Sequence, residues 1–261
     1  MNIEMWVRAL KAARAGAEVS QEALATVIRW SPSTVAAIET GRRRPTMEFA
    51  VAADEALATG GLLAELLRAA DQDRGPSWFA QWREYEQRAL RLRAFEACLV
   101  PGLLQTEAYA RAVISAGGLH APNMVDELVA VRLERQKLLV REVPPHCVFL
   151  VDETGLRRPV GGPAVLDAQL GRLQEVADLP FVRLHVIPLA VGEHVGLGGG
   201  FVLADLPDRE RALYLENAVR GHVMDDPEMI ALIDRKWDSL LGEALSTGAS
   251  LDLIRKLKVT Q

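Results

Sequence analysis

Residues 20–45 have the spacing of two short helices joined by a sharp turn, and this spacing constrains the fold more than any other feature. Ser20 and Ser31 can each cap a helix, because a serine hydroxyl accepts a hydrogen bond from a free N–H of the first turn. Pro32 follows at the first helical position, where its missing N–H costs nothing. Gly41 suits the end of the second helix, since glycine adopts a left-handed conformation without a Cβ penalty. Four apolar side chains would press the helices together: Leu24, Ile28, Val35 and Ile38. The segment therefore predicts a helix-turn-helix unit.

The segment from about residue 5 to residue 70 resembles the phage-repressor-like (XRE) helix-turn-helix family. This resemblance implies a mainly α, five-helix bundle with helices over residues 3–15, 20–28, 31–40, 46–58 and 61–70. In that family the third helix enters the major groove of duplex DNA. Carried over by position, three side chains would face base edges: Ser33, Thr34 and Ala37. The remaining DNA-binding residues would contact the backbone or a flanking groove, or begin the reading helix: Gln21, Ser31, Thr40, Arg42, Arg43 and Arg44.

The expected reading helix offers little for direct recognition of bases. Arg, Asn and Gln side chains make bidentate contacts with base edges, each worth about 1–3 kcal/mol of discrimination. This helix has two hydroxyls and one alanine methyl at the expected positions. We therefore expect weak direct readout. An alternative stays open, in which the serine and threonine only form the first helical turn and the arginine run is a solvated loop.

Charge is distributed unevenly along the chain. The whole chain has 261 residues and a formal net charge of −5, which by itself argues against nucleic acid as a partner. Residues 1–46 nevertheless hold seven Lys or Arg against four acidic residues, a local charge of +3. This asymmetry fits an N-terminal region that contacts DNA and a remainder of the chain that has a different partner. The modest local charge predicts that DNA binding is sensitive to salt.

Cys98 and Cys147 are the two cysteines, and both lie among apolar residues. This setting favours burial over a disulfide or a metal site, and it fits a reducing compartment. No leader pattern occurs, and no run approaches the ~18 apolar residues that span a bilayer. We expect a cytoplasmic protein without a cofactor, a bound metal or a membrane contact.

The second half of the chain combines helical and strand patterns. Residues 71–77, polar and containing Gly-Pro, predict a linker between a domain over 1–70 and one over 78–261. An apolar stripe predicts one helix just after the linker: Trp78, Trp82, Tyr85, Ala89 and Leu92. Further helices are expected over residues 105–115, 123–141, 163–176, 227–245 and 250–258. Strands are expected over residues 146–151, 182–187, 201–206 and 212–215. The predicted class is α+β with a small mixed sheet, in which the first two strands are parallel and the last two form a hairpin.

Four motifs in this half carry a second resemblance: residues 99–110, 132–136, 152–162 and 194–201. In order and spacing they are similar to the WhiJ-like, antitoxin-like regulators of actinobacteria. The resemblance implies a transcriptional regulator whose C-terminal domain has no established chemistry, often encoded beside a small partner protein. Loops at strand ends commonly form sites. We therefore place a ligand or partner site at Asp152, Glu153, Arg157, Arg158 and His194, with a salt-bridged turn as the alternative.

No arrangement in the sequence predicts catalysis. Residues 196–200 mimic a phosphate-binding loop, but a strand follows them where a nucleotide site needs a helix. The five histidines are scattered without metal-ligand spacing, and Ser115 and Ser246 lack the Gly-x-Ser-x-Gly elbow. We expect no catalytic residues. The prediction is a homodimeric, sequence-specific, double-stranded-DNA-binding transcriptional regulator controlled by a ligand or a small partner protein. The alternative is an antitoxin-like interaction adaptor with weak or lost specific DNA binding.

Overall fold

The computed structural model describes residues 3–72, 77–217 and 220–259. The chain divides into two units: Met1–Pro76 and Ser77–Gln261. The expected linker, residues 71–77, lies partly outside the described residues, and α5 (Leu62–Gln72) and α6 (Ser77–Arg88) include its first and last positions. Within the described ranges, no helix has the length and apolar composition required to cross a bilayer.

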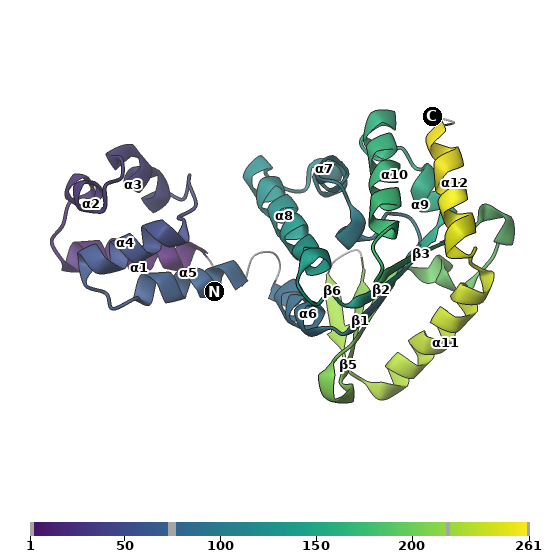
Figure 1. Cartoon of the computed structure of the whole chain (residues 1–261). Coiled ribbons are helices and arrows are strands. Elements are labelled where there is room, and N and C mark those ends of the chain that lie inside the picture. Colours follow the sequence, from purple (N-terminus) through teal and green to yellow (C-terminus); the bar gives the residue numbers. More distant parts are fainter. Residues whose placement is uncertain (1–2, 73–76, 218–219, 260–261) are drawn as a thin grey trace. The chain divides into compact units, whose positions relative to one another are not determined.

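The first unit is helical, as its sequence predicts (Figure 1). Its helices are α1 (Ile3–Gly16), α2 (Gln21–Ile28), α3 (Pro32–Glu39), α4 (Met47–Leu57) and α5. The hydroxyls of Ser20, Ser31 and Thr46 each accept a hydrogen bond from the N–H three residues on, at the starts of α2, α3 and α4. Arg29 ends α2 in the left-handed conformation, with φ of 59°. Gly41 adopts the same conformation just after α3, with φ of 73°. The serine and threonine caps satisfy N–H groups that a helix cannot satisfy itself.

Large side chains from several helices form the core of this unit. Trp6 and Phe49 lie with ring centroids 6.4 Å apart, and the Trp6 Nε1–H donates to the Leu63 carbonyl at 2.6 Å. The buried Asp54 carboxylate accepts hydrogen bonds from the N–H groups of Leu63 at 2.7 Å and Ala64 at 2.8 Å. Because these are free donors at the start of α5, Asp54 on α4 caps α5 and sets the turn between them.

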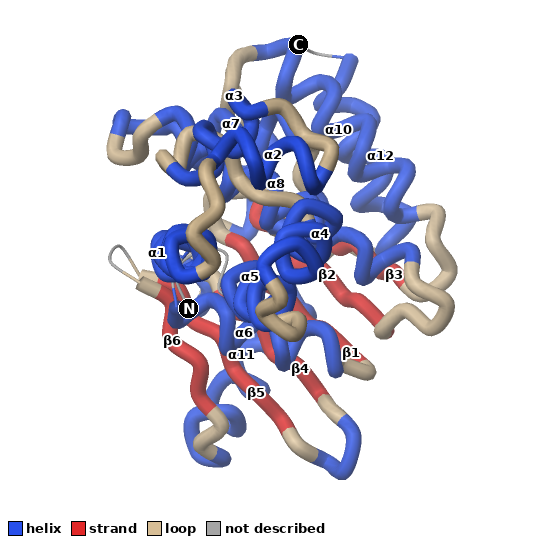
Figure 2. Tube along the Cα trace, turned by 90° about the vertical axis from the view of Figure 1, so that its left-hand side faces the viewer, coloured by secondary structure: helices blue, strands red, loops and turns tan. Residues whose placement is uncertain are grey.

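The second unit is α+β, and its sheet is larger than the small sheet expected from the sequence. Its helices are α6, α7 (Glu107–Ser115), α8 (Pro122–Arg135), α9 (Glu153–Arg157), α10 (Pro163–Ala177), α11 (Pro227–Glu243) and α12 (Thr247–Val259). Its strands are β1 (Arg91–Glu96), β2 (His146–Asp152), β3 (Val182–Ile187), β4 (Phe201–Asp205), β5 (Arg211–Glu216) and β6 (Gly221–Met224). Figure 2 shows the six strands in the order β3-β2-β1-β4-β5-β6.

The sheet is mixed, with a parallel half and an antiparallel half. Strands β1, β2 and β3 are parallel, so the predicted parallel pair of β2 and β3 is confirmed. Strands β4, β5 and β6 continue the sheet in antiparallel fashion, and the predicted hairpin of β4 and β5 is confirmed. The carboxyl ends of β1 and β2 therefore lie at one edge, where Glu96 is in register with Val151.

The prediction from the sequence was wrong for the central strand β1, which was expected to continue a helix. The expected helical stripe runs through Ala89 and Leu92, but α6 ends at Arg88 and the Leu90 N–H donates to the Asp205 carbonyl at 2.9 Å. Helical spacing continued by chance, because Leu92 falls three residues after Ala89. The strand β6 was also missed, since it has four residues. The Trp78 side chain lies outside the described part of the chain.

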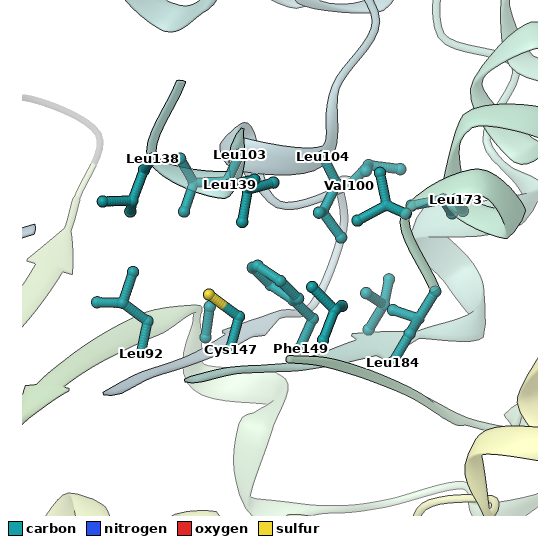
Figure 3. Packing of buried hydrophobic residues seen from close by; sticks show 14 of the residues in the cluster. Leu92, Val100, Leu103, Leu104, Leu138, Leu139, Cys147, Phe149, Leu173 and Leu184 are labelled. Carbon is teal, nitrogen blue, oxygen red and sulfur yellow. The ribbon is translucent and has the colours of Figure 1, made fainter. Parts of the chain in front are cut away.

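Helices cover both faces of the sheet. Side chains alternate along β2, with Cys147 and Phe149 in the cluster shared with α10 and α12, and Leu150 in the cluster shared with α11. Figure 1 shows α11 on the opposite side of the sheet from α10 and α12. Figure 3 shows Leu103 and Leu138 packed against strand residues such as Cys147 and Phe149. This burial on both faces explains the continuous apolar run over residues 147–151 of β2.

The expectation that both cysteines are buried is wrong for one of them. Cys147 is buried on β2, and this burial raises the pKa of its thiol to about 12. Cys98 is exposed, because the chain has left β1 at Glu96 and runs over the surface there. Neither cysteine forms a disulfide.

An ion-pair network holds α11 to the sheet. Asp234 on α11 accepts hydrogen bonds from Arg93 at 2.9 Å and from Arg211 at 2.7 and 2.9 Å. Arg211 also donates to Asp205 at 2.9 Å, and the Arg93 guanidinium lies 5.9 Å from the centre of the Trp237 ring. The hydrogen bonds from Arg211 and then Arg93 hold the pKa of the Asp234 carboxyl below its usual value, although burial acts in the opposite direction.

We predict that Asp234→Asn lowers the free energy of unfolding of the second unit by about 1–3 kcal/mol, because the buried Arg93 loses its carboxylate partner at 2.9 Å and keeps the longer contact with Asp205 at 3.4 Å. The lowered pKa means that the carboxylate stabilises the fold above about pH 4 and loses this effect as the pH falls through the folded pKa. Urea unfolding followed by tryptophan fluorescence at pH 7 and below pH 4 measures both effects. The exposed Asp238→Asn on the same helix is the control. An equal loss from both variants at pH 7 contradicts the prediction.

Candidate functional site

The orientation of α3 is set by an ion pair at its C-terminal end. The Glu39 carboxylate is 2% exposed and accepts hydrogen bonds from Arg14 of α1 at 2.7 and 3.0 Å. Gln21, the first residue of α2, donates a further hydrogen bond to Glu39 at 2.6 Å. Burial alone would raise the pKa of Glu39, but the hydrogen bonds from Arg14 and Gln21 outweigh it and lower the pKa. Three helices therefore meet at one ionised carboxylate.

The first turn of α3 carries a cluster of hydroxyl groups. The Ser31 Oγ lies 3.0 Å from the Ser33 Oγ and 2.8 Å from the Thr34 Oγ1, and it also caps the Thr34 N–H. Ser33 is exposed, whereas only 9% of Thr34 is accessible. The cluster leaves Ser31, which caps the helix, and Ser33 exposed, whereas Thr34 is buried.

Two of the three arginines after α3 lie at the C-terminal ends of helices. Arg42 Nε donates to the hydroxyl of Thr40, the residue that ends α3, at 3.0 Å. Arg44 Nη2 donates to the Ala70 carbonyl, in the last turn of α5, at 3.4 Å. A cation is favourable at such an end, because the partial charge of the helix dipole is negative there. Arg42 is exposed, and Arg44 is half-buried.

The predicted DNA-binding residues surround α3 but differ in exposure. Exposed residues are Ser31, Ser33, Thr40, Arg42 and Arg43. Partly exposed residues are Gln21, Ala37 and Arg44, and Thr34 is buried. Gln21 is held by Glu39, and the Thr34 hydroxyl is held by Ser31. Their contacts with DNA stay a prediction.

In the second unit, the loop over residues 188–200 crosses the carboxyl ends of β2 and β1. The Leu189 N–H donates to the Glu153 carboxylate at 2.9 Å, beyond the end of β2. A Cβ on Gly196 would lie 2.4 Å from the Phe95 ring, and one on Gly200 would lie 2.9 Å from Glu96 Oε2. The glycines predicted as a turn between strands thus let this loop lie directly on β1.

The predicted ligand or partner residues divide into three with buried side chains, Asp152, Glu153 and His194, and two exposed arginines. His194 Nε2 lies 2.9 Å from Asp152 Oδ2, and both side chains are at most 8% exposed. The Gly196 N–H donates to His194 Nδ1, so Nε2 carries the proton that faces Asp152. Asp152 also caps α9 through the Thr154 N–H at 2.7 Å. This pair fastens the 188–200 loop to β2.

The two arginines of this segment differ from the buried pair. Arg157 donates to Glu153 at 2.7 Å, yet half of its side chain is exposed. Arg158, beyond the end of α9, is exposed. The alternative of a salt-bridged turn fits Glu153 and Arg157, and the arginines are the members of the set that a ligand or partner can reach.

The other two motifs meet at the same edge of the sheet. Gln105 donates to the Val100 carbonyl at 2.7 Å and accepts a hydrogen bond from Arg132 at 2.8 Å. Gln136 donates to the Gln105 carbonyl at 2.6 Å. A Cβ on Gly102 would lie 3.4 Å from Arg135 Nη1, so glycine lets the loop after β1 approach α8. Four motifs that are separate in the sequence therefore come together beyond β1 and β2.

No sequence pattern pointed to Glu96, the last residue of β1. Among the described residues its carboxylate has no hydrogen bond or ion pair, although Glu216, Arg132 and Arg135 lie close enough to influence it. Burial raises the pKa of Glu96 to about 7, the Glu216 charge adds to this shift, and the two arginines oppose it. Glu96 was missed because β1 was taken for the end of a helix.

Among the described residues, no group of three or more His, Cys, Asp or Glu side chains could hold a metal ion. A cavity of about 220 Å³ lies between α6 and α8, with the buried side chains of Val131 and Leu138 in its wall. Its polar wall includes the ion pair of Glu86 and Arg135, joined by hydrogen bonds of 2.7 and 2.8 Å.

Comparison with protein families assigns both units. A family described as a helix-turn-helix domain matches residues 7–67, and one described as a domain of unknown function (DUF5753) matches residues 79–256. The chain belongs to the DUF5753 family. Its helix-turn-helix domain suggests a DNA-binding regulator. Neither the curated proteins nor the solved structures contain a match.

We predict that Gly196→Ala destabilises the second unit by about 1–3 kcal/mol, because the new methyl would overlap the Phe95 ring. Gly198→Ala is the matched control, since it lies on the same loop with nothing within 4 Å of its Cβ position. Thermal unfolding measures the difference between the two variants. Equal melting temperatures would show that the loop does not pack on β1.

We predict that Glu96→Gln stabilises the protein increasingly as the pH rises. With a folded pKa of about 7 and an unfolded pKa near 4.3, the wild-type folded state binds more protons between these values. As the pH rises through this range, the free energy of unfolding of the wild type therefore falls relative to that of Glu96→Gln. The difference between the two proteins becomes constant above about pH 8. Urea unfolding from pH 5 to 8.5 measures it, with the exposed Glu193→Gln as the control. Parallel pH profiles for wild type and Glu96→Gln contradict the prediction.

Proposed function

We propose that the protein is a sequence-specific DNA-binding transcriptional regulator that contacts duplex DNA through residues 20–45. The observation that carries the proposal is the geometry of α3, which is capped by Ser31 and locked at Glu39. This arrangement leaves Ser33 exposed on α3, with Arg42 and Arg43 exposed just beyond it. An exposed helix flanked by cations is what a helix-turn-helix places in the major groove beside phosphates.

We further propose that the protein acts as a homodimer in the cytoplasm and has no enzymatic role. A dimer presents two reading helices about 34 Å apart, which matches one turn of duplex DNA. The resemblance to WhiJ-like, antitoxin-like regulators of actinobacteria supports a regulatory role for the second unit rather than an enzymatic one. It also supports a small partner protein encoded nearby.

The second unit would receive the ligand or small partner protein that controls DNA binding. The exposed Arg157 and Arg158 can pair with a carboxylate or phosphate. Leu189, Val195 and Leu197 on the neighbouring loop are between 46% and 64% exposed and would add apolar contacts. Binding there alters DNA affinity only if two states of the protein bind the partner differently.

An antitoxin-like adaptor with weak DNA binding is the second candidate. The observation that favours it is the small side chains of α3 itself, because Ser33, Thr34 and Ala37 make no bidentate base contact. Under this proposal the second unit carries the function. A random-duplex selection that returns no enriched motif from folded protein would favour the adaptor.

We predict that the Arg42→Ala, Arg43→Ala double variant binds duplex DNA more weakly than wild type and with a flatter salt dependence. Each phosphate contact that is lost reduces the slope of log K against log salt by about 0.9. Fluorescence anisotropy of the full chain on a random-sequence duplex, between 50 and 200 mM salt, measures this slope. Arg44 stays unchanged because it contacts α5.

Arg8→Ala is the charge-matched control, since Arg8 is exposed on α1. Equal affinity and slope for the double variant, the control and wild type would contradict the DNA-binding role of residues 20–45.

A further inference from the structure

Arg43 differs from its two neighbours in where its charge lies. Its N–H donates to the Ala37 carbonyl at 3.0 Å, while its Nη1 donates to the Thr34 hydroxyl at 3.3 Å. The backbone of Arg43 is thus fixed near the C-terminal end of α3, and its side chain runs back to the first turn. Gly41, with φ of 73°, makes the reversal that allows this path.

This path covers the face of α3 that was expected to read bases. Thr34 and Ala37 are one turn apart and lie on the same face of the helix. The Thr34 hydroxyl is nearly buried and is shared between Ser31 and Arg43. A base that approaches this face therefore meets the Arg43 guanidinium before it meets Thr34.

The position of this guanidinium is unfavourable for the isolated protein. Arg42 and Arg44 lie at helix C-terminal ends, where the dipole favours a cation, but Arg43 lies at the N-terminal turn of α3, where it does not. Its side chain is exposed, and its side-chain partner among the described residues is the neutral hydroxyl of Thr34. A hydrogen-bond acceptor on a bound molecule would offset this unfavourable interaction of the Arg43 guanidinium with the helix dipole.

We propose that Arg43, positioned by Thr34, reads a guanine in the major groove and supplies the base recognition that the residues of α3 lack. This inference rests on the proposed DNA-binding function. The guanidinium is a planar donor that matches the O6 and N7 acceptors of guanine bidentately. Thr34 is a positioning residue in this arrangement, and Arg42 contacts phosphate without reading sequence.

The test is selection of the full chain on random duplexes, followed by affinity measurement on the selected site and on the site with its guanine replaced. The wild type is expected to enrich a guanine in each half-site and to prefer it about 5- to 150-fold. Arg43→Ala should lose this preference while the rest of the motif remains. Arg43→Lys keeps the charge and should keep the salt dependence, but it should also lose the preference, because an ammonium cannot bind bidentately.

Two further variants separate positioning from charge. Thr34→Val removes the hydroxyl that holds Arg43 while keeping the Thr34 N–H in the Ser31 cap, so it should weaken the guanine preference. Arg42→Ala should weaken binding to every sequence and leave the motif unchanged. An unchanged guanine preference in Arg43→Ala overturns the assignment of Arg43 alone. Absence of any enriched motif in the wild type overturns sequence-specific binding itself.

Discussion

The arrangement of the helix-turn-helix depends on the buried carboxylate of Glu39. An ionised carboxylate removed from water is costly unless charged or polar donors surround it. Arg14 supplies two donors and Gln21 supplies a third, so the cost is offset only when α1, α2 and α3 are all in place. The geometry of α3, and with it the position of Arg43 over Thr34, follows from this requirement.

The second unit shows how glycines can serve packing where they resemble a phosphate-binding loop. In open α/β sheets, ligands bind beyond the carboxyl ends of strands, where the strand order diverges. Here β1 lies between β2 and β4, and the 188–200 loop occupies the space beyond its end. Gly196 and Gly200 bring that loop onto Phe95 and Glu96, and the pair of His194 and Asp152 holds it there.

Glu96 lies beneath this loop without a hydrogen-bonding partner among the described residues. Burial and the nearby Glu216 charge therefore make ionisation of its carboxyl unfavourable, whereas Asp234 on the other face is paired with two arginines. The two acids respond to pH in opposite directions for this reason. Loss of charge stabilises the region around Glu96 and destabilises the attachment of α11.

Local signals in the sequence determined the helix-turn-helix and most of the regular elements. Ser20, Ser31 and Gly41 act through neighbouring backbone groups, so their roles as helix caps and terminator follow from spacing alone. The helix expected over residues 163–176, between the two strands, likewise indicated that β2 and β3 form a parallel pair. Tertiary structure alone decided that residues 91–96 form the central strand, because Arg93 becomes tolerable there only when Asp234, 141 positions away, pairs with it.

The same distinction holds for the candidate sites. The sequence located the helix-turn-helix segment and the four motifs of the second unit. It could not determine that Thr34 is buried beside Arg43, that Asp152 is covered by His194, or that Glu96 has no hydrogen bond or ion pair among the described residues. These outcomes depend on burial and on contacts between segments distant in the chain, which fix the free energy of a charged group but leave no periodic trace in the sequence.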